Sequence, residues 1–405
     1  MTKKKILFYT DCFIFGGCEK PIFNLLSSQK HRELYDAKLV YRKSREYEDG
    51  MAKAYPKISD LNIIPVRFPD ATTIAYFIQG KRQIGFATSY IITLFKVIMK
   101  LLAIPILMYE ICVLFQIFKR DRSEIVHINN GGYPAALSCQ AAAIAAKMVG
   151  KNIIIMNVNN IAYPRWSIIE KAIDYLVALS VDRFITGSQA SAQALSKNRG
   201  FDTRKIKNIY HGIDVPLVEH DDKIYQPSIC MVARLEKRKG HKYVIQAFKE
   251  LLDEQPSMRK IKIYIIGEGP IRYGLRKMVL VNNMQDNIIF MGHRNDYLNY
   301  VARSLFLLNP SLGQEDLPLI IIEAMGLGKP AIGTPVAGIP EEIKHGENGI
   351  LVEPGNVGQL KAAICKLIKD EQIRDQMGVN ARKRFDAMFS SEKMVSEYLA
   401  LYKEV

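Results

Sequence analysis

The sequence predicts an α/β protein built from two doubly wound, Rossmann-like domains. Its 405 residues exceed what a single hydrophobic core usually serves, so two domains are expected. Strand-like runs alternate with helical segments up to residue 210, and the alternation restarts at Ser228 after a polar, acidic linker. We therefore expect an N-terminal domain over 1–215, a C-terminal domain over 216–384, and a C-terminal helix over 385–405 that packs back on the N-terminal domain.

The composition is that of a globular enzyme, with 48% hydrophobic and 24% charged residues. The first apolar run is interrupted by Asp11, so it predicts a first strand and not a signal peptide. No two cysteines form a CxxC pair, which indicates reduced thiols in a cytoplasmic protein and neither a disulfide scaffold nor a zinc site. The six cysteines are Cys12, Cys18, Cys112, Cys139, Cys230 and Cys365.

The positive charge is concentrated in the first half of the chain. The formal net charge is +15, and residues 1–215 hold 30 Lys and Arg against 17 Asp and Glu, which leaves the second half nearly neutral. A basic face attracts nucleic acid, anionic lipid or an acidic substrate. The aromatic-flanked basic motifs of RNA-binding modules are absent, so we expect an anionic membrane surface as partner and no nucleic acid.

The first strand, Lys5 to Thr10, leads into a loop with Gly16 and Gly17 and then into a predicted helix. Such a loop can cradle a phosphate, because backbone N–H groups approach closely and the helix dipole favours anions. Most Gly-Gly pairs are simple turns, so the pair alone is a weak signal. The further strands predicted in this half are residues 36–41, 62–66, 124–128, 152–157 and 182–186.

A long apolar segment, residues 86–118, interrupts this alternation. Its first polar residues recur at helical spacing, and Pro105 is expected to break or kink the helix. Three structures remain open: a transmembrane helix, a helix on the membrane surface, or helices packed on the sheet. Basic residues that favour the membrane surface flank or punctuate the segment, namely Lys81, Arg82, Lys96, Lys100, Lys119, Arg120 and Arg122.

Polar side chains follow two strands that should end at the same edge of the first sheet. His127 ends one strand and precedes Asn129 and Asn130, and Asn157 and Asn159 follow the next strand. Asparagine amides at this edge can bond to sugar hydroxyls. His127 could take part in the site, or it could be a buried strand histidine bonded to backbone.

In the second half, Arg234 and Lys239 bracket a loop between the strand Ser228–Ala233 and a predicted helix. Arginine presents a planar fork to phosphate oxygens and lysine a mobile charge. A loop of this kind before a helix N-terminus can bind phosphate, although basic loops are often only solvated surface.

Two glutamates eight positions apart, Glu315 and Glu323, form the centre around which we expect the chain to be organised. Residues 304–308 predict a buried strand, which places Glu315 in the loop at its carboxyl end. Pro318 suits the first turn of the helix that follows, and Gly326 ends it. Glu323 lies on that helix. As an alternative, Glu315 only caps the helix and Glu323 is a paired, partly buried acid.

Several of these segments, in this order, resemble a family of enzymes. ARLEKRKG (233–240), GEGP (267–270), EDLPLIIIEAMGLGKPAIGT (315–334) and VAGIPEEIKHGENGILVEPGN (336–356) resemble the G-R-L-x-x-x-K-G, G-x-G-P and E-x7-E segments and their continuation in retaining glycosyltransferases of family 4, which have the GT-B fold. GGCE (16–19), EIVHIN (124–129) and HGID (211–214) match more loosely. Asp316 stands where many relatives have glycine.

The resemblance implies a role for each candidate residue. Glu315 would face the transferred sugar, and His127 would act near the sugar or the acceptor. The donor would be bound by Gly17, Arg234, Lys239 and Glu323, with Glu323 on the ribose, and by the amides of Leu317, Leu319 and Ile320. The acceptor would be bound by Asn129, Asn130 and Asn159.

The chemistry of these residues agrees with sugar transfer from a UDP- or GDP-sugar. Cations and a helix N-terminus stabilise the charge that develops on a departing diphosphate. The chain contains no Asp-x-Asp, so we expect no metal and no other cofactor. The basic half suggests a lipid-linked saccharide acceptor at the inner face of the plasma membrane, in surface polysaccharide synthesis. A nucleotide-sugar epimerase or hydrolase of the same fold, or a non-catalytic sugar-binding protein, are the alternatives.

Overall fold

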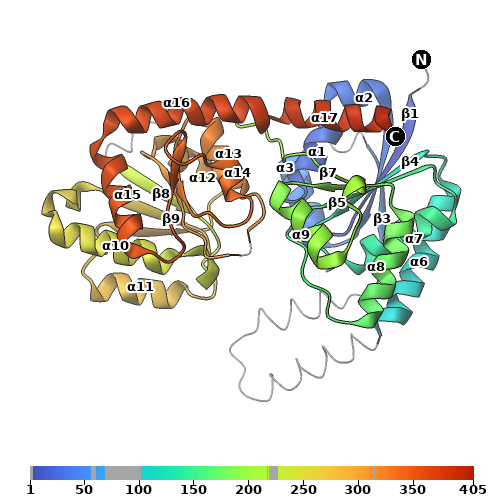
Figure 1. Cartoon of the computed structure of the whole chain (residues 1–405), viewed down its shortest axis with the longest axis horizontal. Coiled ribbons are helices and arrows are strands. Elements are labelled where there is room, and N and C mark those ends of the chain that lie inside the picture. The colour runs from blue at the N-terminus through green and yellow to red at the C-terminus, as the bar shows by residue number, and fades with distance from the viewer. Residues whose placement is uncertain are drawn as a thin grey trace. The chain divides into compact units, whose positions relative to one another are not determined.

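The computed structural model describes residues 3–55, 61–68, 102–134, 136–216, 218, 227–313 and 315–405, which form two compact units (Figure 1). Unit 1 comprises Met1–Thr186, Ala192–Ile209 and Tyr398–Val405. Unit 2 comprises Gly187–Ser191 and Tyr210–Glu397. Each unit therefore takes in a short segment that the sequence alone would assign to the other half of the chain.

Among the described residues, unit 1 contains a parallel sheet in the order β3-β2-β1-β4-β5-β6-β7. The chain moves outward from β1 to β3 and then returns to the other side of β1, which creates a topological switch point between β1 and β4. Both central strands are buried along most of their length because helices cover the two faces (Figure 1). The strands are β1 (Lys4–Thr10), β2 (Tyr35–Arg42), β3 (Asn62–Val66), β4 (Ile125–Asn130), β5 (Ile153–Val158), β6 (Arg183–Thr186) and β7 (Ile206–Asn208).

The helices described for this half follow the alternation that the sequence predicts. They are α1 (Lys20–Ser27), α2 (Gln29–Leu34), α3 (Arg45–Ala54), α6 (Ala103–Arg120), α7 (Leu137–Met148), α8 (Ile168–Ser180) and α9 (Gln189–Arg199). The first residues of α9 group with unit 2 and the remainder with unit 1.

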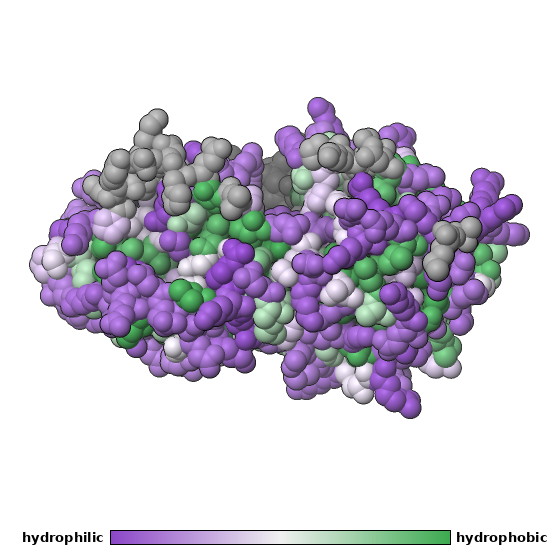
Figure 2. Space-filling view, turned by 90° about the horizontal axis from the view of Figure 1, so that it is seen from above, coloured by the Kyte–Doolittle hydropathy of each residue, from purple (hydrophilic) through white to green (hydrophobic). Residues whose placement is uncertain are grey.

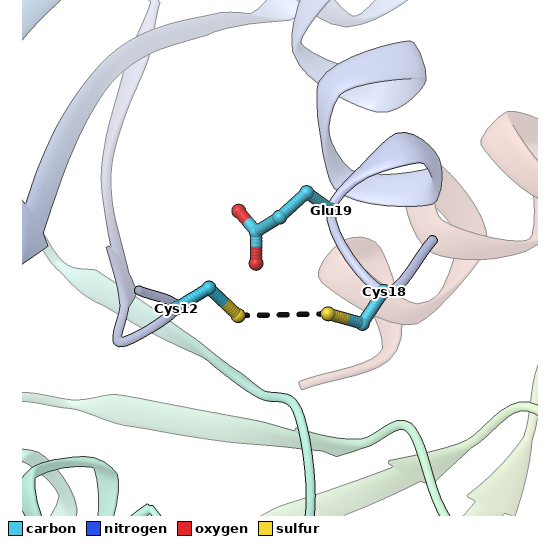
Figure 3. Close-up of side chains that lie close together, drawn as sticks. All are labelled: Cys12, Cys18 and Glu19. Atoms are coloured by element: carbon cyan, nitrogen blue, oxygen red, sulfur yellow. Dashed lines mark hydrogen bonds between the residues drawn. The ribbon is translucent and has the colours of Figure 1, made fainter. Parts of the chain in front are cut away.

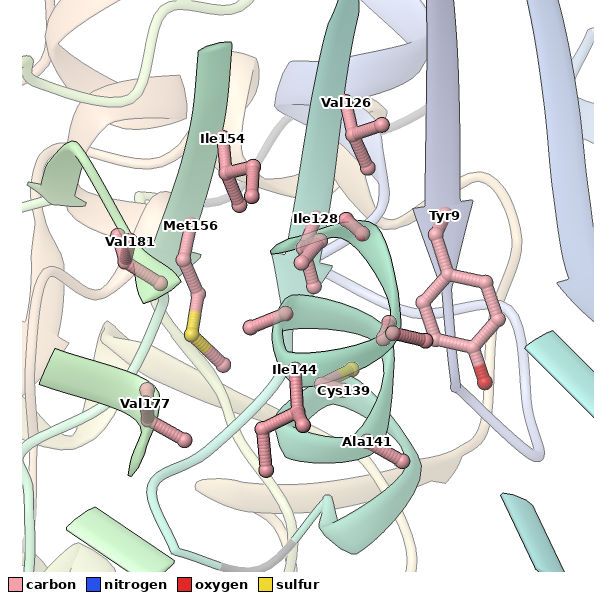
Figure 4. Packing of buried hydrophobic residues seen from close by; sticks show 14 of the residues in the cluster. Tyr9, Val126, Ile128, Cys139, Ala141, Ile144, Ile154, Met156, Val177 and Val181 are labelled. Atoms are coloured by element: carbon pink, nitrogen blue, oxygen red, sulfur yellow. The ribbon is translucent and has the colours of Figure 1, made fainter. Parts of the chain in front are cut away.

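The core of unit 1 lies between the sheet and α7 (Figure 4). Alanines along α7 let this helix approach the strands closely, and Ile144 and Cys139 face Ile128 and Met156 across the gap. All of these side chains are at most 8% exposed. This packing holds the carboxyl ends of β4 and β5, where the polar loops begin, in a defined position.

Of the apolar segment 86–118, residues 86–101 lie outside the described residues. Nearly all of the remainder belongs to α6. Leu107, Ile111, Leu114 and Phe118 form one stripe on α6 that is buried in the core of unit 1. Pro105 does not break this helix: it lies in the first turn, where its missing N–H removes no helical hydrogen bond. None of the helices within the described ranges is long and apolar enough to span a bilayer.

Unit 2 contains a second parallel sheet, in the order β10-β9-β8-β11-β12-β13 over the residues described. Its strands are β8 (Ser228–Val232), β9 (Lys262–Ile266), β10 (Ile288–Gly292), β11 (Leu307–Asn309), β12 (Ala331–Gly333) and β13 (Gly349–Leu351). Its helices are α10 (His241–Glu254), α11 (Arg272–Val281), α12 (Tyr297–Arg303), α13 (Leu319–Gly326), α14 (Ile339–Glu342), α15 (Val357–Lys369), α16 (Glu371–Met388) and α17 (Ser391–Glu404). The end of α17, from Tyr398 onward, groups with unit 1.

Two boundaries differ from the sequence prediction around the central glutamates. The strand begins at Leu307 rather than at Ser304, although Leu305 and Phe306 already form backbone hydrogen bonds with β8. Pro318 precedes the helix as its N-cap instead of lying in the first turn. Its extended ψ of 105° leaves its carbonyl free to accept the Ile321 N–H at 2.9 Å.

The packing of Figure 4 makes a direct prediction about stability. Ile128 is fully buried on β4, so Ile128→Ala should lower the free energy of unfolding by about 2–4 kcal/mol through lost burial and an unfilled cavity. Urea denaturation followed by circular dichroism measures the change. Met148→Ala is the matched control, because Met148 lies at the end of α7 and is 61% exposed. This variant should change stability by less than about 0.5 kcal/mol. Equal effects of the two variants would contradict this account of the core.

Candidate functional site

Glu315 lies in the loop that follows β11 and is the centre of a charged cluster. Its side chain is 7% exposed, and Oε1 accepts hydrogen bonds from Arg238 Nη1 at 3.0 Å, from Ser311 Oγ at 2.9 Å and from Lys239 Nζ. A buried carboxylate is tolerated only when it is paired and hydrogen-bonded, and these two cations meet that condition. Glu315 is therefore more than a helix cap.

The backbone brings the two loops of this cluster together. Arg238 and Lys239 belong to a short 3-10 turn, Lys237–Lys239, which ends at Gly240 with a φ of +79°. A Cβ at Gly240 would lie 2.0 Å from the carbonyl oxygen of Pro310, so only glycine permits this close approach. The Leu312 N–H donates to the Arg238 carbonyl at 2.7 Å and completes the connection.

Arg234 reaches the same cluster indirectly. Its side chain is 73% exposed, and its Nε lies 2.9 Å from Glu236 Oε1. The other oxygen of Glu236 accepts from Arg238 Nε at 2.9 Å. The result is a chain of alternating charges from solvent to the buried Glu315. Arg238 and Glu236 were not singled out in the sequence, because the basic run 237–239 does not reveal which of its cations turns inward.

Glu323 lies on α13 and is 5% exposed. Its Oε1 accepts a hydrogen bond from the Tyr297 hydroxyl on α12 at 2.7 Å. Burial, together with the charge of Glu323, raises the pKa of Tyr297, so this hydroxyl remains a donor. Tyr297 thus orients the carboxylate from a neighbouring helix, a contact between residues 26 apart that no local motif indicates.

The predicted amide donors lie at the start of α13. Pro318 has no N–H, and the Ile321 N–H is bonded to the Pro318 carbonyl. The N–H groups of Leu319 and Ile320 have no acceptor within the helix, as is general for the first turn, and they carry the positive end of the helix dipole. Leu317 is 6% exposed and packs in the core beside this helix.

Asp316 is directed to a different partner from its neighbour Glu315. Its Oδ1 accepts a hydrogen bond from Ser188 Oγ, in the segment Gly187–Ser191 that groups with unit 2. Burial raises the pKa of Asp316 to about 7, against a smaller lowering by Ser188. Gly338 packs against its backbone, since a Cβ there would lie 2.1 Å from the Asp316 carbonyl oxygen. The extra acid therefore does not join the cluster of Arg238 and Lys239.

His127 is fully buried on β4, and both of its ring nitrogens have partners. Nδ1 lies 2.5 Å from the Tyr402 hydroxyl and Nε2 lies 2.8 Å from Asn157 Oδ1. Burial lowers the pKa of His127 to about 4, so the ring is neutral near pH 7. This environment favours the alternative of a buried strand histidine, with side-chain rather than backbone partners, and leaves no ring nitrogen for a substrate.

The three asparagines predicted to bind an acceptor are also buried in unit 1. Asn129 Nδ2 donates to Glu19 Oε1 at 2.8 Å, and Asn159 Nδ2 donates to Asn129 Oδ1 at 2.7 Å. Asn130 accepts from the Gly132 N–H at 3.0 Å and has no exposed surface. In this structure their amides connect the loops that follow β1, β4 and β5, and a role toward an acceptor stays a prediction.

Within the described part of the chain, the loop after β1 contains a group of residues that could hold a metal. Gly17 lies exposed in this loop, and its predicted contact with a diphosphate stays a prediction. Cys12, Cys18 and Glu19 each offer one ligand atom, and these atoms lie within 4.8 Å of one another (Figure 3). The spacing of the cysteines did not indicate this cluster, because a loop between strand and helix brings them together.

The environment of Asp316 predicts a pH dependence of stability. An acid whose pKa is higher in the folded protein than in the unfolded chain binds a proton on folding, so stability falls as the pH rises from about 4 to about 7. The free energy of unfolding should be about 2–3 kcal/mol lower at pH 8 than at pH 5 through this residue. Asp316→Asn should reduce that difference, as measured by urea denaturation at both pH values. An unchanged difference in this variant would refute the prediction.

Comparison with known proteins agrees with this architecture. Residues 220–384 match the family described as glycosyl transferases group 1. Over 302 residues, 72% of this chain and 77% of its relative, the chain is 26% identical to the N-acetyl-alpha-D-glucosaminyl L-malate synthase of Bacillus anthracis. It is 29% identical over 175 residues to the capsular polysaccharide biosynthesis glycosyltransferase CapM of Staphylococcus aureus, 43% of this chain and 45% of that protein.

Solved structures show the same fold over the whole chain. The crystal structure of Anabaena Alr3699/HepE in complex with UDP superposes with a TM-score of 0.75 at 17% identity, covering 99% of this chain and 100% of that one. The matched family domain contains Glu315, Glu323, Arg234 and Lys239. Residues 220–384 therefore match a group 1 glycosyltransferase domain, and the chain is a glycosyltransferase with the two-domain α/β architecture of the GT-B fold.

Proposed function

We propose that this chain is a retaining glycosyltransferase of family 4, which transfers a hexosyl group from a UDP- or GDP-sugar to a saccharide acceptor in surface polysaccharide synthesis. The observation that carries the proposal is the cluster of Arg238, Lys239 and Glu315 within the matched domain. Glu315 lies in the loop that leads into α13, so the cations and the first amides of this helix lie at the same end of the sheet.

The cluster has an excess of positive charge. Arg234, Arg238 and Lys239 oppose the carboxylates of Glu236 and Glu315, and the amides of Leu319 and Ile320 add the helix dipole. Sugar departure leaves negative charge on the diphosphate, and preorganised cations in a buried site lower the barrier to that step. These groups take the place of a metal in the proposed mechanism.

The two glutamates have different environments and hence different proposed roles. Glu323 accepts a hydrogen bond from the Tyr297 hydroxyl through Oε1, and its carboxylate would also accept hydrogen bonds from the ribose hydroxyls of the donor. Glu315 shares its cations with the donor: phosphate oxygens would compete for Arg238 and Lys239 and free the carboxylate to face the sugar. The acceptor would then be deprotonated by a phosphate oxygen on the same face as the leaving group, which retains configuration.

The relatives support the choice of donor and pathway. The structure of Alr3699/HepE was solved in complex with UDP, and CapM is named for capsular polysaccharide biosynthesis. We extend both properties to this chain as part of the proposal: a UDP-sugar as the first donor to test, and a capsule, exopolysaccharide or lipopolysaccharide unit as the product.

We further propose a lipid-linked acceptor and a peripheral position on the inner face of the membrane. One face of α6 is buried in the core, whereas Leu102, Ile104, Met108 and Tyr109 near its start are 44–56% exposed. Lys119 and Arg120 follow at its other end. Only a few apolar side chains of α6 are exposed, which suits shallow contact with a lipid surface more than insertion. Figure 2 shows one face of the protein, on which apolar residues form small patches among hydrophilic ones.

The donor site yields a prediction for two variants. Glu315→Gln should lower the turnover number about 100-fold or more, because a charge that acts in the transition state is lost. Arg238→Ala should mainly raise the Michaelis constant for the donor, by roughly 10- to 100-fold. Steady-state kinetics with a UDP-sugar measure both, and Lys277→Ala, an exposed lysine on α11, is the matched control. An unchanged turnover number in Glu315→Gln would exclude its proposed role.

A panel of UDP- and GDP-sugars tests the reaction class. Slow hydrolysis of one donor, accelerated by a lipid-linked saccharide, is the expected result. Release of UDP that no acceptor accelerates would indicate an epimerase or hydrolase. A protein that binds sugar without turnover, and keeps that binding in Glu323→Ala, would indicate a non-catalytic function.

Flotation with anionic liposomes tests the membrane proposal. Deleting residues 86–118 would remove part of the core, because Leu114 and Phe118 are buried, so point variants are needed. The double variant Ile104→Glu with Met108→Glu should lose most liposome binding. Leu280→Glu, at an exposed apolar position on α11 in unit 2, should retain it. Equal flotation of both variants would contradict a membrane contact through α6.

A further inference from the structure

Three potential metal ligands meet in the loop between β1 and α1 of unit 1. Cys12 follows the strand, and Cys18 and Glu19 directly precede the helix. The two sulfur atoms lie 3.5 Å apart, and the carboxylate of Glu19 points toward the space beside them (Figure 3). Two thiolates bound tetrahedrally to Zn²⁺ at about 2.3 Å lie about 3.8 Å apart, so the sulfurs need to move little to share one ion.

Glu19 is a buried carboxylate without a cationic partner among the described residues. Its Oε1 accepts from Thr10 and from Asn129, both at 2.8 Å, and its Oε2 accepts from the Tyr47 hydroxyl at 2.6 Å. A carboxylate has about four acceptor positions; three accept from these neutral donors, and the Cys12 thiol, whose proton a bound cation would displace, is a fourth donor. Those donors also orient the carboxylate, as the outer partners of a metal ligand do.

The three ligand atoms lie within 4.8 Å of one another. Each of these groups is negatively charged when deprotonated, so the three charges would repel one another at this distance. A divalent cation held between them would stabilise two thiolates and a carboxylate together.

We propose that Cys12, Cys18 and Glu19 form a binding site for a thiophilic divalent cation, with Zn²⁺ as the expected ion. Binding forms two metal–sulfur bonds and one metal–oxygen bond and releases two thiol protons to solvent. Both cysteines are partly exposed residues, and water would supply the fourth ligand. This site shares no residue with the cluster of Arg238, Lys239 and Glu315.

The ion would act on the shape of the loop. Gly16 and Gly17 lie between the two cysteines, and the Cys18 carbonyl accepts from Asn129 at 3.3 Å and from Asn159 at 3.4 Å. A metal bound by Cys12 and Cys18 would therefore link the two ends of the 12–18 loop, which is already hydrogen-bonded to Asn129 at the end of β4 and to Asn159 after β5. The site would restrict the glycine loop that the sequence predicts to approach a phosphate.

Cobalt titration of the full-length protein tests the proposal. The protein is reduced with a phosphine, freed of metal, and titrated with Co²⁺ alone. We expect one equivalent to bind, with a near-ultraviolet thiolate charge-transfer band and visible bands of a tetrahedral ion, and Zn²⁺ to abolish both. Cys12→Ser and Cys18→Ser should each lose the charge-transfer band, and Glu19→Gln should weaken binding about 10-fold or more.

Cys112→Ser is the matched control, because Cys112 is an exposed thiol on α6 and should have no influence on the titration. Thermal unfolding of the metal-free variants shows whether each one folds. The proposal is overturned if the wild-type protein shows no charge-transfer band, or if the band survives in folded Cys12→Ser with Cys18→Ser. It is also overturned if a glutathione buffer at cytosolic ratio converts the pair to a disulfide, with the loss of two hydrogens in the mass, before metal binds.

Discussion

The burial of the Glu315 carboxylate beside Arg238 and Lys239 is the interaction on which the proposed donor site depends. A carboxylate in this position would be strongly destabilising without its cations, and two cations this close would repel each other without the carboxylate. The cluster therefore holds the 237–240 turn against the 310–315 loop before any donor is bound. The proposed donor site is therefore charged, oriented and only partly neutralised by its own residues, which is the condition for electrostatic catalysis.

Unit 1 uses a different chemistry at the corresponding edge of its sheet. Its polar side chains are mostly neutral, and they surround Glu19 through Thr10, Tyr47 and Asn129. His127 is part of a second buried network with Asn157 and Tyr402. These networks fix the loops after β1, β4 and β5, so their amides and rings shape the unit and do not themselves project from it.

Local patterns in the sequence were sufficient for the architecture and for part of the site. Alternating strand and helix segments predicted two parallel sheets, and the run from Glu315 to Thr334 located the central helix. Boundaries were less certain: β11 begins three residues later than expected, and Pro318 caps α13 instead of entering it. Asp316 could not be assigned from sequence, because its partner Ser188 is 128 positions away.

The sequence by itself determined the fold class, the position of both glutamates and the presence of basic residues in the loop before α10, because periodicity and short motifs are properties of neighbouring residues. Only the tertiary structure decided which cation meets Glu315, that His127 has both nitrogens occupied, and that Cys12, Cys18 and Glu19 share one loop. Each of these depends on contacts between elements, and the direction of a side chain across such a contact is set by packing and burial, which no local pattern encodes.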